Sequence, residues 1–276
     1  MQKLDIITEF SRAQFSRFFL LCKSFFSEGL IEKIEKYLNF TNSLLVPLSA
    51  VIILISALIF SIKLSTATPL FLAILAVFFV FFGDFISEKF HGACRAAIKS
   101  NPTSISSNAY LELIVFLNIF FVVGLFFGGI YYAIAESSLT IFLGCLAGAV
   151  LVLLATVPVL NPHIINMSIS TKSGAASDLV GIIAIGLKSL LYYSKLFARL
   201  VIIGGGLLLL FATYGMLAED FSAVMRGSTG LGVLLVGFFY PVIVYIWFLL
   251  VYTVADILLA VLSIKEIKAS ADQAKD

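Results

Sequence analysis

Charged residues are scarce in this 276-residue chain. Asp, Glu, Lys and Arg make up only 12% of it, whereas soluble domains carry about 25%. Apolar residues make up 61%, and the mean hydropathy is +1.10. The net charge of +2 lacks the basic excess that nucleic-acid binding requires. This composition predicts an all-α, polytopic integral membrane protein whose surroundings are the lipid bilayer.

Cysteine and histidine are also rare. Cys22, Cys94 and Cys145 are odd in number and widely spaced, which excludes a disulfide framework or a CxxC motif. His91 lies three residues before Cys94, but the only other histidine is His163, so a metal site would lack ligands. No P-loop, HExxH or GxSxG motif is present. We therefore predict no enzyme activity, catalytic residue, metal or cofactor.

Long apolar runs are the main feature that is present. Each run is bounded by charged residues, proline or small polar residues, and each is near the length of about 20 residues that a helix needs to cross a bilayer. The first begins only near Leu44, after a mixed-charge start that does not resemble a signal peptide. We predict six transmembrane helices, at residues 44–62, 69–86, 111–134, 139–160, 200–217 and 229–262.

Lys and Arg are distributed unevenly between these spans. Residues 1–43 hold six, 87–110 three, 161–199 four and 264–276 three, whereas the remaining connections hold only Lys63 and Arg226. The positive-inside rule therefore places both termini in the cytoplasm. Because the opposite side has only short connections and no glycosylation sequon, we predict a bacterial inner membrane protein.

Three regions follow from these boundaries. Residues 1–43 form a cytoplasmic amphipathic helical segment. Residues 44–134 contain the first three spans and a cytoplasmic loop at 87–110. Residues 135–276 contain the last three spans, a cytoplasmic amphipathic helix at 175–199 and a cytoplasmic tail at 264–276.

Two segments have the periodicity of helices that lie on a membrane surface. Residues 179–199 are apolar enough for a seventh span, yet polar residues recur every three or four positions, which puts them on one helix face. A similar face is expected between residues 7 and 25, either against lipid or against the protein itself, with a break near residues 27–29. The predicted membrane-surface residues are Phe10, Phe18, Phe25, Lys188, Lys195 and Arg199.

Two Asn-Pro pairs, Asn101-Pro102 and Asn161-Pro162, each follow an apolar run. Half-helix caps of a pore would have to enter the membrane from opposite sides, and both pairs are predicted on the cytoplasmic side. We therefore interpret them as turns, because Asn favours turns and helix N-caps and Pro suits a first helical turn.

Few polar residues lie within the predicted spans. Such residues either form hydrogen bonds between helices or serve a transport path. The candidates for either role are Asn118, Asp84, Asp256, Thr156 and Tyr214. Gly124-x-x-x-Gly128 and Gly144-x-x-x-Gly148 lie in successive spans and predict a close hairpin with its small faces inward.

Two functions remain open. The first is a non-catalytic scaffold: a subunit of a larger membrane assembly, with other membrane subunits or copies of itself as partners, or a protein that shapes the bilayer through its cytoplasmic amphipathic helices. The second is a small-solute or ion transporter or channel that uses Asn118, Asp84 and Asp256. The scarcity of polar residues in the spans favours the first.

Overall fold

The computed structural model describes residues 28–137, 139–170 and 175–273, together with Arg17, Leu21 and Ser24. The predicted amphipathic segment at residues 7–25, with Phe10, Phe18 and Phe25, falls outside the continuous ranges. Its prediction therefore stays a prediction.

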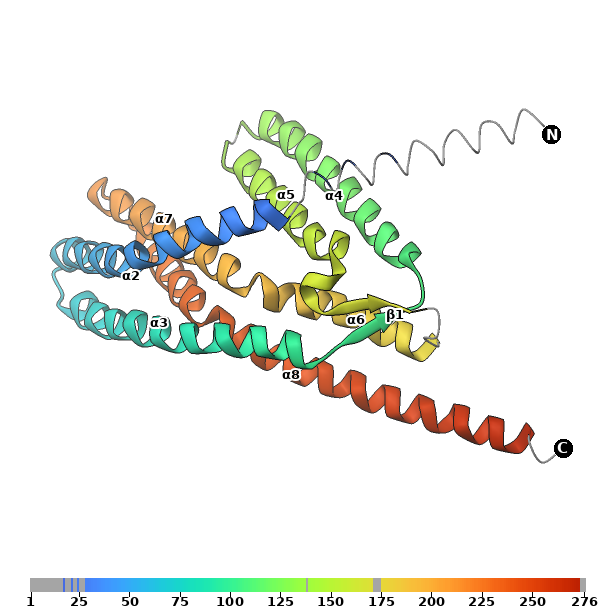
Figure 1. Cartoon of the computed structure of the whole chain (residues 1–276). Helices are drawn as coiled ribbons and strands as arrows, with labels where there is room; N and C mark the ends of the chain where they lie inside the picture. The colour runs from blue at the N-terminus through green and yellow to red at the C-terminus, as the bar shows by residue number, and fades with distance from the viewer. Residues whose placement is uncertain are drawn as a thin grey trace. The chain divides into compact units, whose positions relative to one another are not determined.

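The described chain is helical apart from two strands of three residues each (Figure 1). In chain order the elements are α2 (Glu28–Leu64), α3 (Thr68–Ser100), β1 (Thr103–Ile105), α4 (Asn108–Ala135), α5 (Leu139–Leu160), the 3₁₀ helix η1 (Pro162–Ile165), β2 (Met167–Ile169), α6 (Ala175–Tyr192), α7 (Ser194–Leu217) and α8 (Ala223–Gln273).

Five helices in the described ranges are long and apolar enough to cross a membrane. They comprise Leu44–Leu64, Thr68–Ser100, Asn108–Ala135, Ser194–Leu217 and Ala223–Val261. Five of the six predicted spans lie on these helices. The sixth, predicted at 139–160, corresponds to α5, whose described apolar stretch is the shorter Gly144–Leu160. These lengths and compositions support an integral membrane protein.

Several helices extend past the predicted spans. α2 runs unbroken through the predicted boundary at residue 43, and α8 continues through Pro241 to Gln273. α3 continues to Ser100, so most of the predicted loop at 87–110 is helix and only residues 101–107 connect α3 to α4. Hydropathy marks where a helix meets lipid, whereas the backbone hydrogen bonds of a helix continue wherever no residue interrupts them.

The predicted amphipathic helix at 175–199 is two helices. α6 ends at Tyr192, and α7 begins at Ser194 and continues into the predicted fifth span. The polar positions that were predicted to share one face are therefore divided between α6 and α7. Among the helices of the described ranges, α6 is not one of the five that meet the length and composition for a span.

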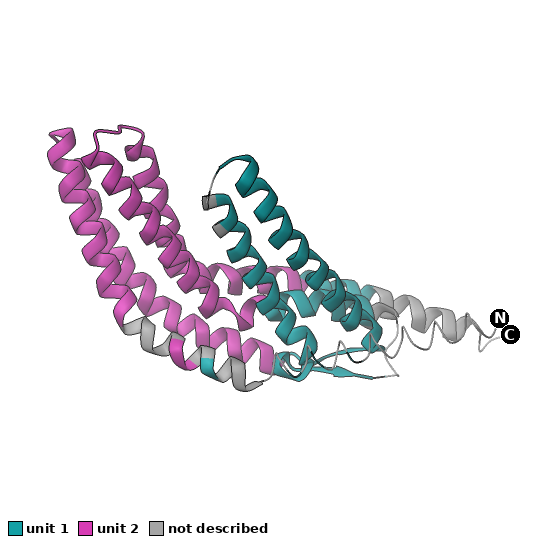
Figure 2. Cartoon of the chain, turned by 90° about the horizontal axis from the view of Figure 1, so that it is seen from above, with its two compact units in different colours: residues 1–33, 101–189, 254–276 teal, residues 34–100, 190–253 magenta. Residues whose placement is uncertain are grey.

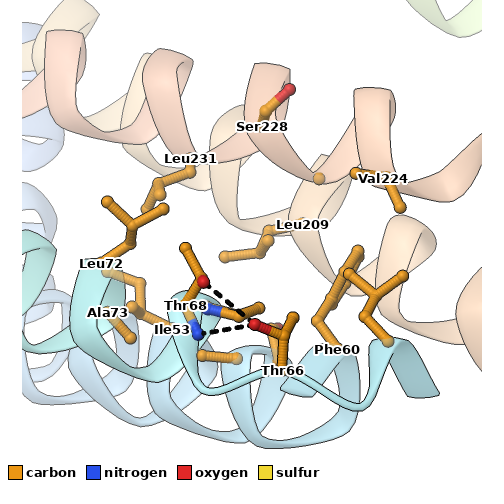
Figure 3. Close-up of a pocket in the computed structure, with 15 residues that line it drawn as sticks. Ile53, Phe60, Thr66, Thr68, Leu72, Ala73, Leu209, Val224, Ser228 and Leu231 are labelled. Atoms are coloured by element: carbon orange, nitrogen blue, oxygen red, sulfur yellow. Dashed lines mark hydrogen bonds between the residues drawn. The ribbon is translucent and has the colours of Figure 1, made fainter. Parts of the chain in front are cut away.

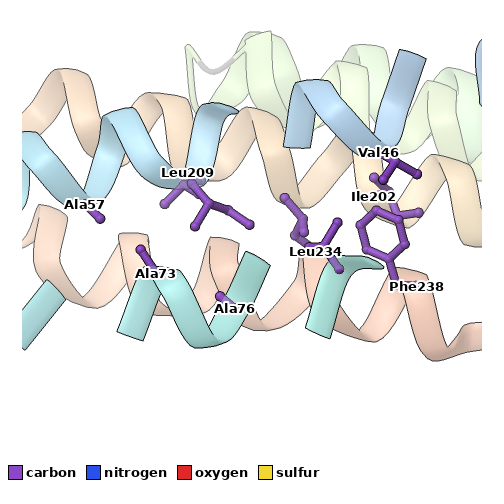
Figure 4. Close-up of a cluster of buried hydrophobic side chains, with 10 residues drawn as sticks. Val46, Ala57, Ala73, Ala76, Ile202, Leu209, Leu234 and Phe238 are labelled. Carbon is purple, nitrogen blue, oxygen red and sulfur yellow. The ribbon is translucent and has the colours of Figure 1, made fainter. Parts of the chain in front are cut away.

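The chain divides into two compact units (Figure 2). Unit 2 comprises Ile34–Ser100 and Leu190–Thr253, and therefore holds most of α2, all of α3 and α7, and the first part of α8. Its core is a cluster of buried side chains from these four helices (Figure 4): Val46, Ile53, Ala57, Ala73, Ala76, Val80, Ile202, Leu209, Leu234 and Phe238.

Unit 1 comprises Met1–Lys33, Asn101–Ser189 and Val254–Asp276. Its described part contains the α4–α5 hairpin, both strands, η1 and most of α6. Ile105 from β1 and Ile165 from η1 are fully buried. This burial identifies the connections around the strands, rather than the hairpin tip, as the packed centre of the unit.

Candidate functional site

The two Asn-Pro segments meet in unit 1, although they lie 60 residues apart in the sequence. β1 and β2 pair in parallel, with Thr103 opposite Met167, Ser104 opposite Ser168 and Ile105 opposite Ile169 (Figure 1). We call residues 101–107 and 161–170, with the α6 side chains that contact them, the Asn-Pro junction.

Local chemistry explains how the second segment reaches the strand. The Asn161 side chain donates to Val157 O (3.2 Å), a carbonyl at the end of α5 that also accepts from Asn161 N (3.0 Å). Pro162 then opens η1, whose first turn suits its fixed φ. Asn166 ends η1 with φ 53°, a left-handed conformation that Asn tolerates better than most residues. The two pairs therefore differ: Pro102 leads directly into β1, whereas Pro162 begins η1, in which Asn161 makes no side-chain N-cap bond.

Lys188 of α6 lies at the centre of the junction and is 0% exposed. Its ammonium group donates to Asn101 O, to Thr103 Oγ1 (3.0 Å) and to Asn166 O (3.3 Å). Asn166 O also accepts from Thr103 N (3.3 Å). The three protons of the ammonium group are therefore all used, and they join both Asn-Pro segments to α6.

Two further contacts attach α6 to β1. Asp178, in the first turn of α6, accepts hydrogen bonds from Ser106 N (2.6 Å) and from Ser106 Oγ. Gly181 packs directly against β1, since a Cβ there would overlap Ile105 Cγ2 and lie 2.9 Å from Ser104 O. A carboxylate at a helix N-terminus is also favoured by the helix dipole.

The three oxygen atoms that accept from Lys188 belong to neutral groups. Within the described residues, no carboxylate is hydrogen-bonded to this buried charge. Burial lowers the pKa of the Lys188 ammonium from 10.5 to about 8. Because all three of its protons are bound by the protein, this group is suited to holding segments together rather than to reacting with a substrate.

The sequence missed most of this junction. Lys188 was predicted on the membrane surface, and Asp178, Thr103 and Asn166 were not singled out. One signal was available: the tripeptide Ser-Ile-Ser occurs at 104–106 and at 168–170, and the structure pairs these copies in register. The Asn-Pro pairs themselves are out of register, because η1 separates only the second pair from its strand.

The polar span residues have different environments. Asn118 Nδ2 donates to Thr156 Oγ1 (3.1 Å), which in turn donates to Val152 O (2.9 Å), so this pair joins α4 to α5. Tyr214 and Asp256 are exposed. Asp84 is half-buried, and its carboxylate acts electrostatically on Arg199 in the same unit.

Two of the predicted surface cations need correction. Lys188 is buried in the junction, and Arg199 of α7 is only 3% exposed. Lys195 is half-buried. Lys188 is buried because it bonds to both Asn-Pro segments, and Arg199 is one of the buried residues of α7.

The glycines of the α4–α5 hairpin pack differently from the prediction. A Cβ on Gly124, Gly128 or Gly144 would meet nothing within 4 Å, and one on Gly148 would only contact Leu125 Cδ1 at 3.5 Å. The close approach instead occurs at Gly129, where a Cβ would lie 2.6 Å from the Cβ of Cys145. The motif therefore located the hairpin but not the face on which its helices meet.

Neither metal chemistry nor similarity identifies this site. Within the described residues, no three His, Cys, Asp or Glu side chains are grouped closely enough to hold a metal ion. Comparisons with protein-family models, with curated proteins and with solved structures found no match. A function must therefore be argued from the side chains themselves.

Proposed function

We propose that this chain is a non-catalytic multi-pass membrane protein that serves as a subunit of a larger membrane assembly or organises the bilayer. In this proposal it resides in a bacterial inner membrane with both termini and the Asn-Pro junction in the cytoplasm, as the distribution of Lys and Arg favours. Its partners are lipid and either other membrane subunits or further copies of the chain.

The observation that carries this proposal is the bonding of Asn118 to Thr156. A transport path needs polar groups that face a solvated passage. The deepest amide in the predicted spans is instead bonded to the neighbouring helix. In unit 2, Thr213 Oγ1 and Ser56 Oγ form a similar link between α7 and α2, 2.7 Å long. These pairs are typical of polar groups that fix helices together in lipid.

The exposed face of α4 favours the existence of a partner helix. Only 11% of its most apolar stretch is buried, and Gly124 and Gly128 leave open space beside it. Small residues on an exposed transmembrane helix let the backbone of another helix approach closely.

We expect the double substitution Gly124→Leu, Gly128→Leu to leave the chain folded, because no atom lies where the new side chains begin. It should reduce the co-purifying partner, or the homo-oligomer seen by native electrophoresis, by about tenfold or more, since a lost helix contact of about 1.4 kcal/mol already changes binding tenfold. Gly92→Leu is the matched control, because its position on α3 is equally open. Equal recovery of partners with the wild type, the double variant and the Gly92→Leu control would contradict the proposal.

One observation favours the transport alternative. Among the described residues, the three guanidinium nitrogens of buried Arg199 have no hydrogen-bond partner, although Asp84 acts on them electrostatically. Ionisable groups that are buried within an apolar helix long enough to span a membrane are costly and are often functional. Asp84→Asn is therefore the substitution that separates transport from assembly.

A further inference from the structure

An apolar pocket lies within unit 2, where α2 turns into α3 beside α7 and α8 (Figure 3). Its volume is about 350 Å³, which falls in the range of roughly 300–1,000 Å³ that ligand sites occupy. Its lining includes Ser56, Ala57, Ala73, Leu209, Gly227 and Leu231. All the lining residues belong to one compact unit, so the pocket is a property of that unit alone.

Small side chains explain why the pocket exists. Ala57 of α2, Ala73 of α3 and Gly227 of α8 all line it. Elsewhere in the same core, larger residues such as Leu234 and Phe238 fill the space between the helices. A packed core leaves few voids larger than a water molecule. Because the exposed residues Leu72 and Val224 line this space, it is open on one side and another molecule can enter it.

The hydroxyl groups that line the pocket are already hydrogen-bonded within the protein. The pocket therefore offers few hydrogen-bond partners to a water molecule. Thr66 and Thr68 share a hydrogen bond of 3.0 Å at the α2–α3 turn (Figure 3). Ser228 donates to Met225 O, and Ser56 is bonded to Thr213. Apolar walls that offer few polar partners favour an apolar occupant over ordered water.

Two charged residues that are next in sequence to lining residues of the pocket are already paired. Lys63, beside the lining residue Leu64, contacts Glu219 at 3.5 Å. Arg226, beside the lining residue Gly227, is paired with Asp220. No charged side chain of the described residues lines the pocket, so its walls select for an apolar chain.

We propose that this pocket binds one aliphatic chain, either of a phospholipid or of a free fatty acid. Helices that meet the criteria for membrane spans surround it, and these are in contact with acyl chains in a bilayer. The exposed lining residues Leu72 and Val224 provide an apolar entrance. This proposal is independent of the function proposed above.

The test uses the full chain in phosphatidylcholine vesicles with a photoactivatable diazirine on the acyl chain. One arm carries the diazirine on phosphatidylcholine, and the other on added palmitic acid; cross-linked residues are mapped by mass spectrometry. We expect labelling at Leu72, Val224 and Leu231 to exceed that at the lipid-exposed Phe211 at least fivefold in one arm or both. The arm that labels identifies the source of the chain.

Filling the pocket should remove this labelling. The double substitution Ala57→Leu, Ala73→Leu occupies it from two buried positions, and Val224→Phe occupies it from an exposed position that puts folding at little risk. We expect each to reduce labelling of Leu72 and Leu231 at least fivefold. Val236→Phe, at an exposed position of the same helix outside the lining, should not. Labelling no stronger than at Phe211, or equal labelling in Val224→Phe and Val236→Phe, would overturn the proposal.

Discussion

Lys188→Met is expected to lower the free energy of unfolding by about 3 kcal/mol at pH 7. The change takes the Lys188 donor away from three half-buried acceptors, Asn101 O, Thr103 Oγ1 and Asn166 O, of which Asn166 O still accepts from Thr103 N. Each such acceptor costs about 1–3 kcal/mol. Removing the buried charge returns about 3 kcal/mol, because the pKa of Lys188 is about 8 rather than 10.5. The midpoint of thermal unfolding in detergent measures the difference.

The matched control is Lys89→Met, since Lys89 is exposed and only lies over the ring of Phe85, 4.4 Å from its centroid. Its loss should stay below about 1 kcal/mol. Equal losses for the two variants would show that Lys188 does not hold the junction together.

The free energy of unfolding should depend on pH in the wild type but much less in the Lys188→Met variant. The folded-state pKa of Lys188 lies below its unfolded value, so the unfolded chain binds more protons between about pH 8 and 10.5. The unfolding free energy of the wild type should therefore rise with pH across this window, by up to about 1.4 kcal/mol per pH unit, and the Lys188→Met variant should lack this rise. The difference in unfolding free energy between the wild type and the Lys188→Met variant should widen from pH 7 to pH 10.

Gly205→Ala is expected to cost about 3 kcal/mol or more, because it forces α7 away from α8. A Cβ at Gly205 would overlap Leu234 N and lie 2.7 Å from Leu234 Cα. Backbone atoms cannot move aside as a flexible side chain does, so the two helices would have to separate. The same hairpin is held close at Gly230 and Gly237, whose Cβ atoms would lie 2.7 Å and 2.8 Å from backbone nitrogens of α7.

The neighbouring Gly204 provides the control, since a Cβ there would meet nothing within 4 Å. Gly204→Ala should be neutral or should stabilise the chain by up to about 1 kcal/mol through helix propensity. The midpoints of thermal unfolding of Gly205→Ala and Gly204→Ala in the same detergent measure this difference. A similar midpoint for both would contradict the close α7–α8 contact.

The contacts of Lys188 and Gly205 could not be predicted from the sequence. The predicted spans at 111–134 and 200–217 lie within the apolar helices α4 and α7, because contact with lipid imposes a composition that is visible without tertiary structure. Hydropathy could not show that α3 continues to Ser100, because a helix outside the bilayer needs no apolar composition. Similarly, glycines 204–206 were visible as a cluster, but only packing shows which of them contacts α8.

The Asn-Pro junction was harder to predict. Its strands have three residues each, too few for a period of two to stand out. Lys188 was assigned to a surface because lysine is almost never fully buried without a partner. Its partners are backbone carbonyls and one hydroxyl, which carry no sequence signature. The pairing of Asn118 with Thr156 was within reach, because a buried amide must find a partner.

The measurement that tests the proposed function most directly is rescue of a strain that lacks the chain. Asn118→Leu removes the bond to Thr156 but leaves the bond from Thr156 to Val152 O; Asp84→Asn and Asp256→Asn remove the remaining candidates for coupling. If these side chains are structural or unused, each variant should restore the wild-type phenotype whenever it accumulates to wild-type amounts. Loss of rescue by Asp84→Asn in a folded, normally abundant protein would contradict assembly as the function and support transport.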